Sequence, residues 1–566
     1  MNSDARWFKY YGNVPHTIEY PDISLYDIVF EAAQKHPMNI AYDFMGKSVS
    51  YKDFIAEIDT CAEALSVYGV SAGDTVTVCL PNVPQAVIMF YAINKLGAIA
   101  SMIHPLSAEN EILFYINEVK SKIAITLSRF YDKFEAIKGK THIEKLIVCK
   151  IEEVLPALKG FMYKFVGGEP KVSTAPGIIS WPDFIASSKK CAVDIMPYGK
   201  GKDEAVILFS GGTTGTSKGI LLSNLNFNAL ALQTAAASGC FEAGDVMLSV
   251  MPVFHGFGLA VGIHTMLASG GMCVLVPQLD VKKFAGLFKK YRPSYMAGVP
   301  TLFEAMLRNE DMKNADLSCL KGLFSGGDSL SVELKKKIDA FIQERGAKIQ
   351  VREGYGATEC VTASCLTPID YYREGSIGIP FPDTYYKIVI PGTNDEAPIG
   401  QMGEITIAGP TVMQGYINNP KETSQTLRIH DDGITYLHTG DLGYMDEDGF
   451  IYFVQRLKRM IVTSGYNVYP SQIENVIDSH EAVSFSTVIG VKDDYRMQRV
   501  KAFIVLKPGF APSDETMNSI KAHCEKSIAK YALPREYEFR DNLPKTLVGK
   551  VAYRELEKEE AQKTGI

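Results

Sequence analysis

The sequence predicts an α/β protein with a large N-terminal domain of helix-covered sheets, which includes a small β-barrel subdomain, and a small α+β C-terminal domain. Up to about residue 410, helical stretches alternate with short runs rich in Val, Ile and Leu, a rhythm typical of parallel sheets covered on both faces. Three strand-like runs lie close together between residues 385 and 454. After Arg456 the order changes to helix, strand, strand and helix. We therefore expect two domains, residues 1–455 and 456–566.

Each predicted element rests on the period of its apolar residues. Helical spacing marks residues 54–68, 85–95 and 281–291, and Phe54, Ile58 and Leu65 share one face of the first helix. Compact apolar runs bounded by Gly or Pro predict strands at 75–80, 205–209 and 272–276. The strands of the β subdomain are expected at 385–390, 403–408 and 449–454.

In the C-terminal domain we expect helices at 471–480 and 513–531 and strands at 485–490 and 501–506. Ser513 is suited to cap the second of these helices, and the acidic residues Asp514 and Glu515 follow in its first turn. This succession of elements indicates a compact unit of its own.

The composition indicates a cytoplasmic protein and argues against a general binder of nucleic acid, although it leaves room for a local basic patch. The net charge is −7, from 58 Lys and Arg against 65 Asp and Glu. The ten cysteines include no CxxC pair, which indicates reduced thiols in a cytosolic compartment. Residues 1–11 show no signal-peptide core.

Two apolar stretches are long enough to test as membrane spans. Residues 86–103 carry Asn94 and Lys95 at their centre, and residues 258–277 carry His264 and a Gly-Gly pair. A polar or charged group at the middle of a span is costly in lipid, so we expect both stretches to be buried core segments.

A glycine- and hydroxyl-rich loop follows the strand predicted at 205–209. Residues 210–219 read SGGTTGTSKG. Glycines let backbone N–H groups approach phosphate oxygens, and hydroxyls and a lysine add donors and positive charge. The Walker pattern does not fit, because Ser217 precedes Lys218 and Gly219 follows it. A surface turn is the alternative. The candidate phosphate-binding residues are Ser210, Gly211, Gly212, Thr213, Thr214, Gly215 and Lys218.

Two further motifs carry groups suited to a nucleotide. Residues 354–359 read GYGATE, in which Tyr355 can stack on a base, Thr358 can donate to a phosphate and Glu359 can offer oxygen to Mg²⁺. Residues 438–443 read HTGDLG, which places the carboxylate of Asp441 on a tight loop, suited to two neighbouring hydroxyls. Taken alone, each motif is also compatible with a glycine-rich turn.

The ordered series of motifs resembles the adenylate-forming superfamily, which includes acyl-CoA synthetases, luciferases and peptide-synthetase adenylation domains. The resemblance covers roughly residues 25 to 555. It implies that ATP and a carboxylic acid react, with Mg²⁺ as the cofactor, to form an acyl-adenylate. The acyl group is then transferred to coenzyme A as a thioester. It also implies that the small C-terminal domain is mobile and swings between the two half-reactions.

The resemblance assigns a role to particular residues of this chain. The resemblance implies that Tyr355 with Gly356, and the segment at Gly327 and Asp328, bind adenine. It implies that Thr358 binds the α-phosphate and that Glu359 binds the metal. It implies that Asp441 and Arg456 bind the ribose and that Lys458 is the interdomain hinge. It also implies that Gly465 and Tyr466 face the thiol tunnel. Lys550 matches the catalytic lysine, whereas for Lys545 we retain a solvated surface charge. Gln455 and Arg459 depart from the common pattern beside the hinge.

The identity of the acid is less sharply specified. Residues 251–258 resemble the segment that acyl- and aryl-CoA ligases place beside the acid. There His255 is expected to guide the carboxylate or to gate the thiol tunnel. The alternative is a structural role, which is common for a histidine beside Phe. An amino acid is disfavoured, because the segment lacks an acidic residue for an ammonium group. Residues 151–166 form an amphipathic pattern, which suits either peripheral membrane contact or packing on its own domain.

We therefore expect a medium- or long-chain fatty acid as the substrate, with aryl or steroid acids as the alternative. Two further hypotheses remain open. The enzyme could load the thiol of a separate carrier protein, or the protein could be a non-catalytic sensor of acyl or AMP groups. The presence of Lys550, Glu359 and Asp441 speaks against a sensor.

Overall fold

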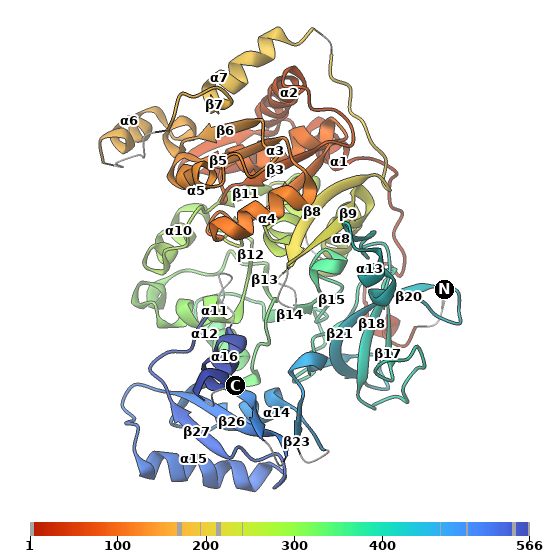
Figure 1. Ribbon diagram of the computed structural model, residues 1–566, viewed down its shortest axis with the longest axis vertical. Helices are drawn as coiled ribbons and strands as arrows, with labels where there is room; N and C mark the ends of the chain where they lie inside the picture. Colours follow the sequence, from red (N-terminus) through yellow and green to blue (C-terminus); the bar gives the residue numbers. More distant parts are fainter. Residues whose placement is uncertain are drawn as a thin grey trace. The chain divides into compact units, whose positions relative to one another are not determined.

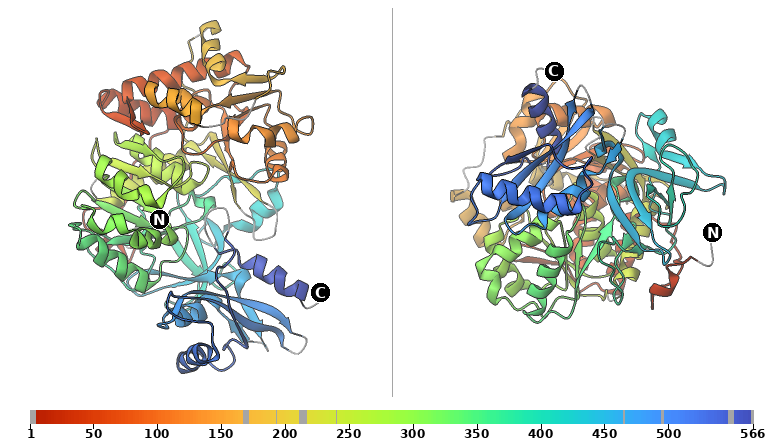
Figure 2. Two further views of the ribbon diagram at one scale, coloured as in Figure 1. Left: turned by 90° about the vertical axis from the view of Figure 1, so that its left-hand side faces the viewer. Right: turned by 90° about the horizontal axis from the view of Figure 1, so that it is seen from below.

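The computed structural model describes residues 5–166, 172–192, 194–210, 217–239, 241–463, 466–493, 496–545 and 551–563. The chain forms two compact units (Figures 1 and 2). Unit 1 comprises Met1–Leu330, Leu334–Tyr386 and Ile407–Leu437, and unit 2 comprises Ser331–Glu333, Lys387–Thr406 and His438–Ile566.

An eight-stranded sheet of unit 1 carries the strands on both sides of the glycine-rich loop. Its order is β19-β9-β8-β4-β3-β5-β6-β7. The strands from β8 to β7 run parallel, whereas β9 is antiparallel to β8 and to β19. The bounds are β3 (Thr75–Cys79), β4 (Ile99–Met102), β5 (Ile123–Leu127), β6 (Lys145–Cys149), β7 (Ile178–Ser180), β8 (Glu204–Ser210), β9 (Lys218–Ser223) and β19 (Gly415–Tyr416). The strands predicted at 75–80 and 205–209 are confirmed.

A nine-stranded sheet of unit 1 has the order β16-β15-β14-β13-β12-β10-β11-β1-β2. Its six central strands, from β14 to β1, run parallel, so their carboxyl ends lie at one edge. The bounds are β1 (Ile40–Phe44), β2 (Lys47–Ser50), β10 (Val246–Ser249), β11 (Met272–Leu275), β12 (Tyr295–Gly298), β13 (Gly322–Ser325), β14 (Val351–Tyr355), β15 (Cys365–Leu366) and β16 (Ile379–Pro380). Green segments form most of this sheet in Figure 1.

The helices up to residue 426 alternate with these strands, as the sequence predicts. They are α1 (Leu25–Lys35), α2 (Tyr51–Val67), α3 (Pro84–Lys95), α4 (Glu109–Val119), α5 (Tyr131–Ala136), α6 (Ala157–Val166), α7 (Trp181–Ala186), α8 (Asn224–Ser238), α9 (Thr265–Ala268), α10 (Phe284–Tyr291), α11 (Pro300–Arg308), α12 (Val332–Gln343) and α13 (Pro420–Thr426). Short 3-10 turns are η1 (Phe8–Tyr10), η2 (Ser128–Phe130), η3 (Ile151–Val154), η4 (Ser187–Lys190), η6 (Val281–Lys283), η7 (Glu310–Asn314), η8 (Thr358–Cys360) and η9 (Leu457–Arg459); η5 (Phe257–His264) is a π-helix.

Both apolar stretches are core segments, as predicted. Every residue of α3 is buried, including Asn94, whose side chain donates to Asn224 Oδ1. The second stretch forms η5, α9 and β11, and His264 within it is fully buried between Tyr91 and Asn228. Burial lowers the pKa of His264 to about 3, so the imidazole is neutral. None of the helices in the described ranges is both long and apolar enough to cross a membrane.

The amphipathic helix predicted at 151–166 is two elements instead of one. Residues Ile151–Val154 form η3, and α6 begins at Ala157. The break lies at Leu155, which is extended (φ −79°, ψ 159°) because Pro156 follows it. Val154 and Leu155 are buried, whereas Leu158 on α6 is exposed, so the expected single apolar face is divided between the interior and the surface.

The predicted β subdomain is a five-stranded sheet of order β17-β18-β21-β20 with β22 paired to β21. Its strands are β17 (Tyr385–Val389), β18 (Gly403–Ala408), β20 (Leu427–Ile429), β21 (Thr435–Met445) and β22 (Ile451–Arg456).

The C-terminal α+β unit also matches the prediction. Its sheet has the order β24-β23-β26-β25 with β27 paired to β26, and α15 lies along one face of it (Figures 1 and 2). Ser513 caps α15 by accepting from the Thr516 N–H, although the helix ends at Ser527, before the predicted residue 531. The bounds are β23 (Ile461–Thr463), β24 (Tyr466–Val468), β25 (Val483–Asp493), β26 (Met497–Leu506), β27 (Glu536–Phe539), α14 (Pro470–Asp478), α15 (Asp514–Ser527) and α16 (Tyr553–Lys563).

Candidate active site

Two of the predicted nucleotide motifs meet at the carboxyl edge of the nine-stranded sheet. Strands β13 and β14 are parallel neighbours, with Ser325 opposite Glu353. Gly326, which follows β13, therefore lies beside Gly354 near the end of β14. The carboxyl edge is where open α/β sheets bind ligands, because loops and helix N-termini gather there.

The GYGATE motif is held in a strained loop. Tyr355 is the last residue of β14, and a Cβ on Gly356 would lie 2.4 Å from the carbonyl oxygen of Thr362, so only glycine fits. The chain returns through Val361 (φ 61°) and Thr362 (φ 113°), conformations that cost energy for residues other than glycine. Strain of this kind is concentrated at binding loops.

The glycine-rich loop connects two adjacent antiparallel strands. Ser210 at the end of β8 lies opposite Lys218 at the start of β9. The predicted phosphate-binding residues Gly211, Gly212, Thr213, Thr214 and Gly215 lie outside the described residues. Just beyond them, the hydroxyl of Ser217 lies 3.2 Å from the Tyr115 hydroxyl.

Lys218 and Glu359 both contact one segment, β19 and α13. The Lys218 ammonium forms an ion pair with Glu422 and lies 4.9 Å from the ring centroid of Tyr416. The Tyr416 hydroxyl donates to Glu359 Oε1 at 2.9 Å. Burial, together with the charge and hydrogen bond of Glu359, raises the pKa of Tyr416 well above its usual range, so the hydroxyl remains a donor. Tyr416 and Glu422 lie outside all the motifs that the sequence predicts for the site.

The residues present fit a magnesium ion that is shared with phosphate oxygens. Within the described part of the chain, no three His, Cys, Asp or Glu side chains cluster as a metal cage. Mg²⁺ commonly takes one or two protein carboxylates and completes its octahedron with water and phosphate. Glu359 can supply one such oxygen while Tyr416 holds the carboxylate in place.

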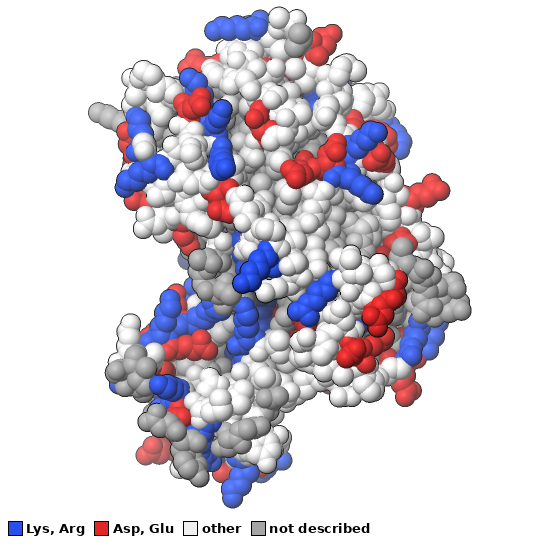
Figure 3. All heavy atoms as spheres, turned by 45° about the vertical axis from the view of Figure 1, so that its right-hand side comes forward, with Lys and Arg blue, Asp and Glu red and all other residues white. Residues whose placement is uncertain are grey.

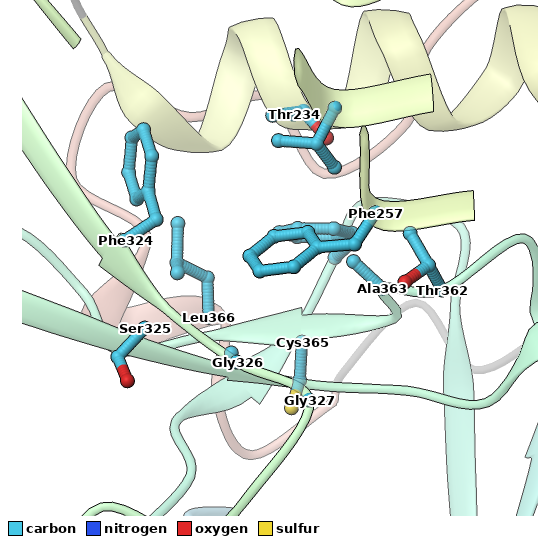
Figure 4. A pocket seen from close by; sticks show the side chains of 13 residues that line it. Thr234, Phe257, Phe324, Ser325, Gly326, Gly327, Thr362, Ala363, Cys365 and Leu366 are labelled. Carbon is cyan, nitrogen blue, oxygen red and sulfur yellow. The ribbon is translucent and has the colours of Figure 1, made fainter. Parts of the chain in front are cut away.

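An apolar cavity opens beside the same loop (Figure 4). Thr362 and Ala363 contribute to its wall, and Phe257 lies across it opposite Leu366 and Gly326. It is lined by Thr234, Phe257, Val261, Phe324, Ser325, Gly326, Gly327, Gly354, Thr362, Ala363, Cys365, Leu366 and Phe381. The lining carries no ionisable side chain apart from the thiol of Cys365, whose pKa burial raises to about 12. The cavity therefore suits an uncharged, apolar group.

The structure places His255 beside this cavity's π-helix but not in its lining. Its Nδ1 accepts from the Phe257 N–H at 3.2 Å, in the turn that starts η5. The ring thus stabilises the turn that presents Phe257 to the cavity. Gly327, with φ 80°, lines the cavity, and Asp328 is exposed and accepts from the Ser329 N–H.

The predicted ribose-binding residues lie together in unit 2. Asp441 on β21 faces Arg456 on β22, and the carboxylate Oδ1 is 3.2 Å from Arg456 Nε. Glu404 fixes the turn before Asp441, because its two carboxylate oxygens accept from His438 Nδ1 and from the Gly440 N–H, both at 3.0 Å. No predicted motif includes Glu404, which lies on a different strand, β18.

The segment predicted as the hinge begins with η9, which contains Lys458. Arg459 departs from the pattern of the superfamily, and its guanidinium forms an ion pair with Glu474 on α14 and lies 5.0 Å from the ring centroid of Tyr553. This arginine therefore has a structural partner within unit 2. Gln455 is 2% exposed.

Three other predicted residues of unit 2 lie next to or outside the described ranges. Tyr466 stacks on Tyr531, with ring centroids 4.6 Å apart and both rings largely exposed. Gly465 and the predicted catalytic residue Lys550 lie outside the described residues. Their roles remain predictions.

On the face in Figure 3, basic and acidic groups alternate over the upper part of the molecule. The described cysteines are all free thiols, most of them buried, as expected for reduced residues.

Comparison with known proteins finds matches over nearly all of the chain. Residues 29–417 match the family model of AMP-binding enzymes, and residues 472–550 match the model of their C-terminal domain. A Bacillus subtilis (strain 168) protein named long-chain-fatty-acid–CoA ligase is 33% identical over 571 residues, which is 99% of either chain. A Salmonella typhimurium protein of the same name is 31% identical over 97% of either chain. ATP-bound MatB from Rhodopseudomonas palustris has a TM-score of 0.82 at 25% identity and covers 95% of this chain and 99% of its own.

Proposed function

The chain belongs to the family of AMP-binding enzymes, and from this premise we propose that it is an AMP-forming acid–CoA ligase for long-chain fatty acids. The observation that carries the proposal is the apolar cavity beside the motif at 354–359. Thr362 and Ala363, which line the cavity, lie three and four residues after Glu359. An acid with an apolar tail in this cavity has its carboxylate end available to the motif.

The reaction has two steps. The acid carboxylate attacks the α-phosphorus of ATP and pyrophosphate leaves; the thiolate of coenzyme A then attacks the acyl carbonyl and AMP leaves. Bound Mg²⁺ would neutralise charge on the phosphates, with Glu359 as its protein ligand. Thr358 donates to the α-phosphate, Asp441 accepts from the ribose hydroxyls, and Lys550 lowers the repulsion between carboxylate and phosphate oxygens.

The lining of the cavity supports a fatty acid over an amino acid or a dicarboxylic acid. Phe257, Val261, Phe324, Leu366 and Phe381 contribute only carbon, and burying a charged group among them would be costly. Each methylene buried there stabilises the complex by about 0.8 kcal/mol. We therefore expect the affinity for the acid to increase with each methylene that such an apolar lining covers.

AMP release tests the proposed substrate class. Straight-chain acids from C2 to C18 are compared with cinnamic, benzoic and bile acids, in the presence of ATP, Mg²⁺ and coenzyme A. A maximum in kcat/KM at long chains supports the proposal. Activity confined to the aryl or steroid acids would overturn the choice of substrate, and adenylate without thioester would point to a carrier-protein thiol.

We also propose that α6 makes peripheral contact with an anionic membrane from the cytoplasmic side. Leu158, Phe161 and Met162 are 74%, 63% and 59% exposed, which is unusual for side chains of this size. Lys159 follows Leu158 on α6, and the ammonium groups of Lys159 and Lys290 both lie beside Gly46, with Nζ 3.4 and 3.3 Å from the position that a Cβ there would occupy. These five residues are the α6 patch.

The charge of the α6 patch suits an anionic lipid surface. Lys159 Nζ donates to the carbonyl oxygen of Met45, and among the described residues neither Lys159 nor Lys290 forms an ion pair with a carboxylate. Exposed apolar side chains flanked by such ammonium groups combine the two contributions to binding at a bilayer interface.

For the domains, we propose that the functional boundary lies between residues 455 and 456.

A further inference from the structure

The residues proposed to bind the metal and the phosphates carry opposite charges, and Tyr416 contacts both. Its hydroxyl donates to Glu359 Oε1 at 2.9 Å, and its ring lies 4.9 Å from Lys218 Nζ. Tyr416 is 9% exposed, so these contacts lie in a water-poor environment.

The backbone of Tyr416 is fixed relative to both motifs. In β19, Tyr416 lies opposite Ile220 of β9, the strand that follows the glycine-rich loop. Its N–H donates to Thr423 Oγ1 at 2.9 Å. On the other side, the Met413 N–H donates to the carbonyl oxygen of Glu359 at 2.8 Å. One short segment thus joins the phosphate loop to the GYGATE motif.

We propose that Tyr416 is a positioning residue for nucleotide and metal binding: its hydroxyl orients the Glu359 carboxylate toward the metal, and its ring keeps Lys218 apart from that carboxylate. This inference rests on the proposed function, in which Glu359 holds Mg²⁺. It adds a residue outside the motifs at 210–219 and 354–359 to the machinery of adenylation.

The physical reason is the tendency of an unshielded lysine and carboxylate to pair. In a poorly hydrated site, a direct ion pair between Lys218 and Glu359 would occupy the metal ligand and the phosphate-binding cation together. The Tyr416 ring offers Lys218 a cation–π contact, and Glu422 offers it a carboxylate at another position. The neutral hydroxyl takes one lone pair of Glu359 and leaves the other oxygen to the metal.

Two substitutions separate the hydroxyl from the ring. Tyr416→Phe keeps the ring and removes the donor, whereas Tyr416→Leu removes both. The matched control is Tyr42→Phe, since the Tyr42 hydroxyl donates to Glu57 Oε2 at 2.6 Å in another part of unit 1. Binding of Mn²⁺ in place of Mg²⁺ is measured by electron paramagnetic resonance, with a non-hydrolysable ATP analogue present and without acid or coenzyme A.

We expect Tyr416→Phe to weaken Mn²⁺ binding about tenfold or more, the loss of one hydrogen bond to a charged group, with little change in the affinity for the metal-free analogue. Tyr416→Leu should weaken the binding of both. Compared with Tyr416→Leu, Tyr416→Phe should therefore bind the analogue normally while still binding the metal weakly.

Wild-type Mn²⁺ affinity in Tyr416→Phe, or an equal loss in Tyr42→Phe, would overturn the inference. Failure of the proposed function is distinguishable, because it would appear as wild-type protein that binds Mn²⁺ and the analogue but releases no AMP with any acid.

Discussion

Asp441 and Arg456 lie opposite each other on β21 and β22, with 3.2 Å between Asp441 Oδ1 and Arg456 Nε. Asp441 is 2% exposed, so its charge is held in a poorly hydrated position. A buried carboxylate beside a guanidinium is pre-oriented, which suits it to accept from neighbouring hydroxyls. This pair is the structural basis for the proposed recognition of the ribose.

Asp441→Asn should raise KM for ATP about tenfold or more, because an amide cannot accept from two hydroxyls as a carboxylate can. The measurement is a double-mutant cycle with 2′-deoxy-ATP. We expect the deoxy nucleotide to be a poorer substrate for the wild type, and the penalty to be smaller in the variant. Equal penalties in the two proteins would place the ribose elsewhere.

Lys550→Ala should lower the rate of acyl-adenylate formation about 100-fold, because the charge between carboxylate and phosphate is lost. Thioester formation from supplied acyl-adenylate should change far less. Single-turnover assays of the two half-reactions provide the measurement. Lys545→Ala is the matched control, since we assign Lys545 no role in the chemistry. An equal loss in both variants, or in both half-reactions, would refute the assignment.

Glu353, which precedes the GYGATE motif on β14, makes stability depend on pH. Burial raises its pKa from 4.5 to about 8; the charge of Lys335 opposes this shift and that of Asp339 adds to it. Because the folded value is the higher, its stabilising effect is complete below pH 4.5 and is lost as the pH rises through about 8.

Glu353→Gln removes this titration while keeping the shape of the side chain. We expect the Tm of the variant to match the wild type at pH 5 and to exceed it by about 2 °C at pH 9. Differential scanning fluorimetry across this range is the measurement. A difference in Tm that does not vary with pH would contradict the assignment to Glu353.

The α6 patch predicts binding to anionic vesicles. Replacing Leu158 and Phe161 by Glu should abolish sedimentation with vesicles of phosphatidylglycerol and phosphatidylcholine, and leave activity on a soluble C8 acid within about twofold of wild type. Met196→Glu is the control, because Met196 is 75% exposed and lies in a different segment. If wild type does not sediment with these vesicles, or if the double variant still does, the patch is not a membrane contact.

The regular elements of the fold could be predicted because their pattern is local. The helix expected at 85–95 is α3, and the strand expected at 403–408 is β18 with the same bounds. Local patterns also misled in one place. The apolar period of 151–166 resembles one helix, but Pro156 forces Leu155 into an extended conformation and divides it.

The contacts of the candidate site could be predicted only where a motif supplies them. Glu359 and Asp441 are identified by short motifs, whereas their partners are set by sheet topology. Tyr416 is 57 residues from Glu359, and Glu422 is 204 residues from Lys218. No periodicity reports such pairings, because they arise only when β19 joins β9.

The central claim is tested most directly by the stoichiometry of the reaction with hexadecanoic acid, ATP, Mg²⁺ and coenzyme A. We predict one AMP and one pyrophosphate for each hexadecanoyl-CoA formed, with no ADP. Formation of ADP, or release of AMP without any thioester, would contradict the assignment of this chain as an AMP-forming fatty acid–CoA ligase.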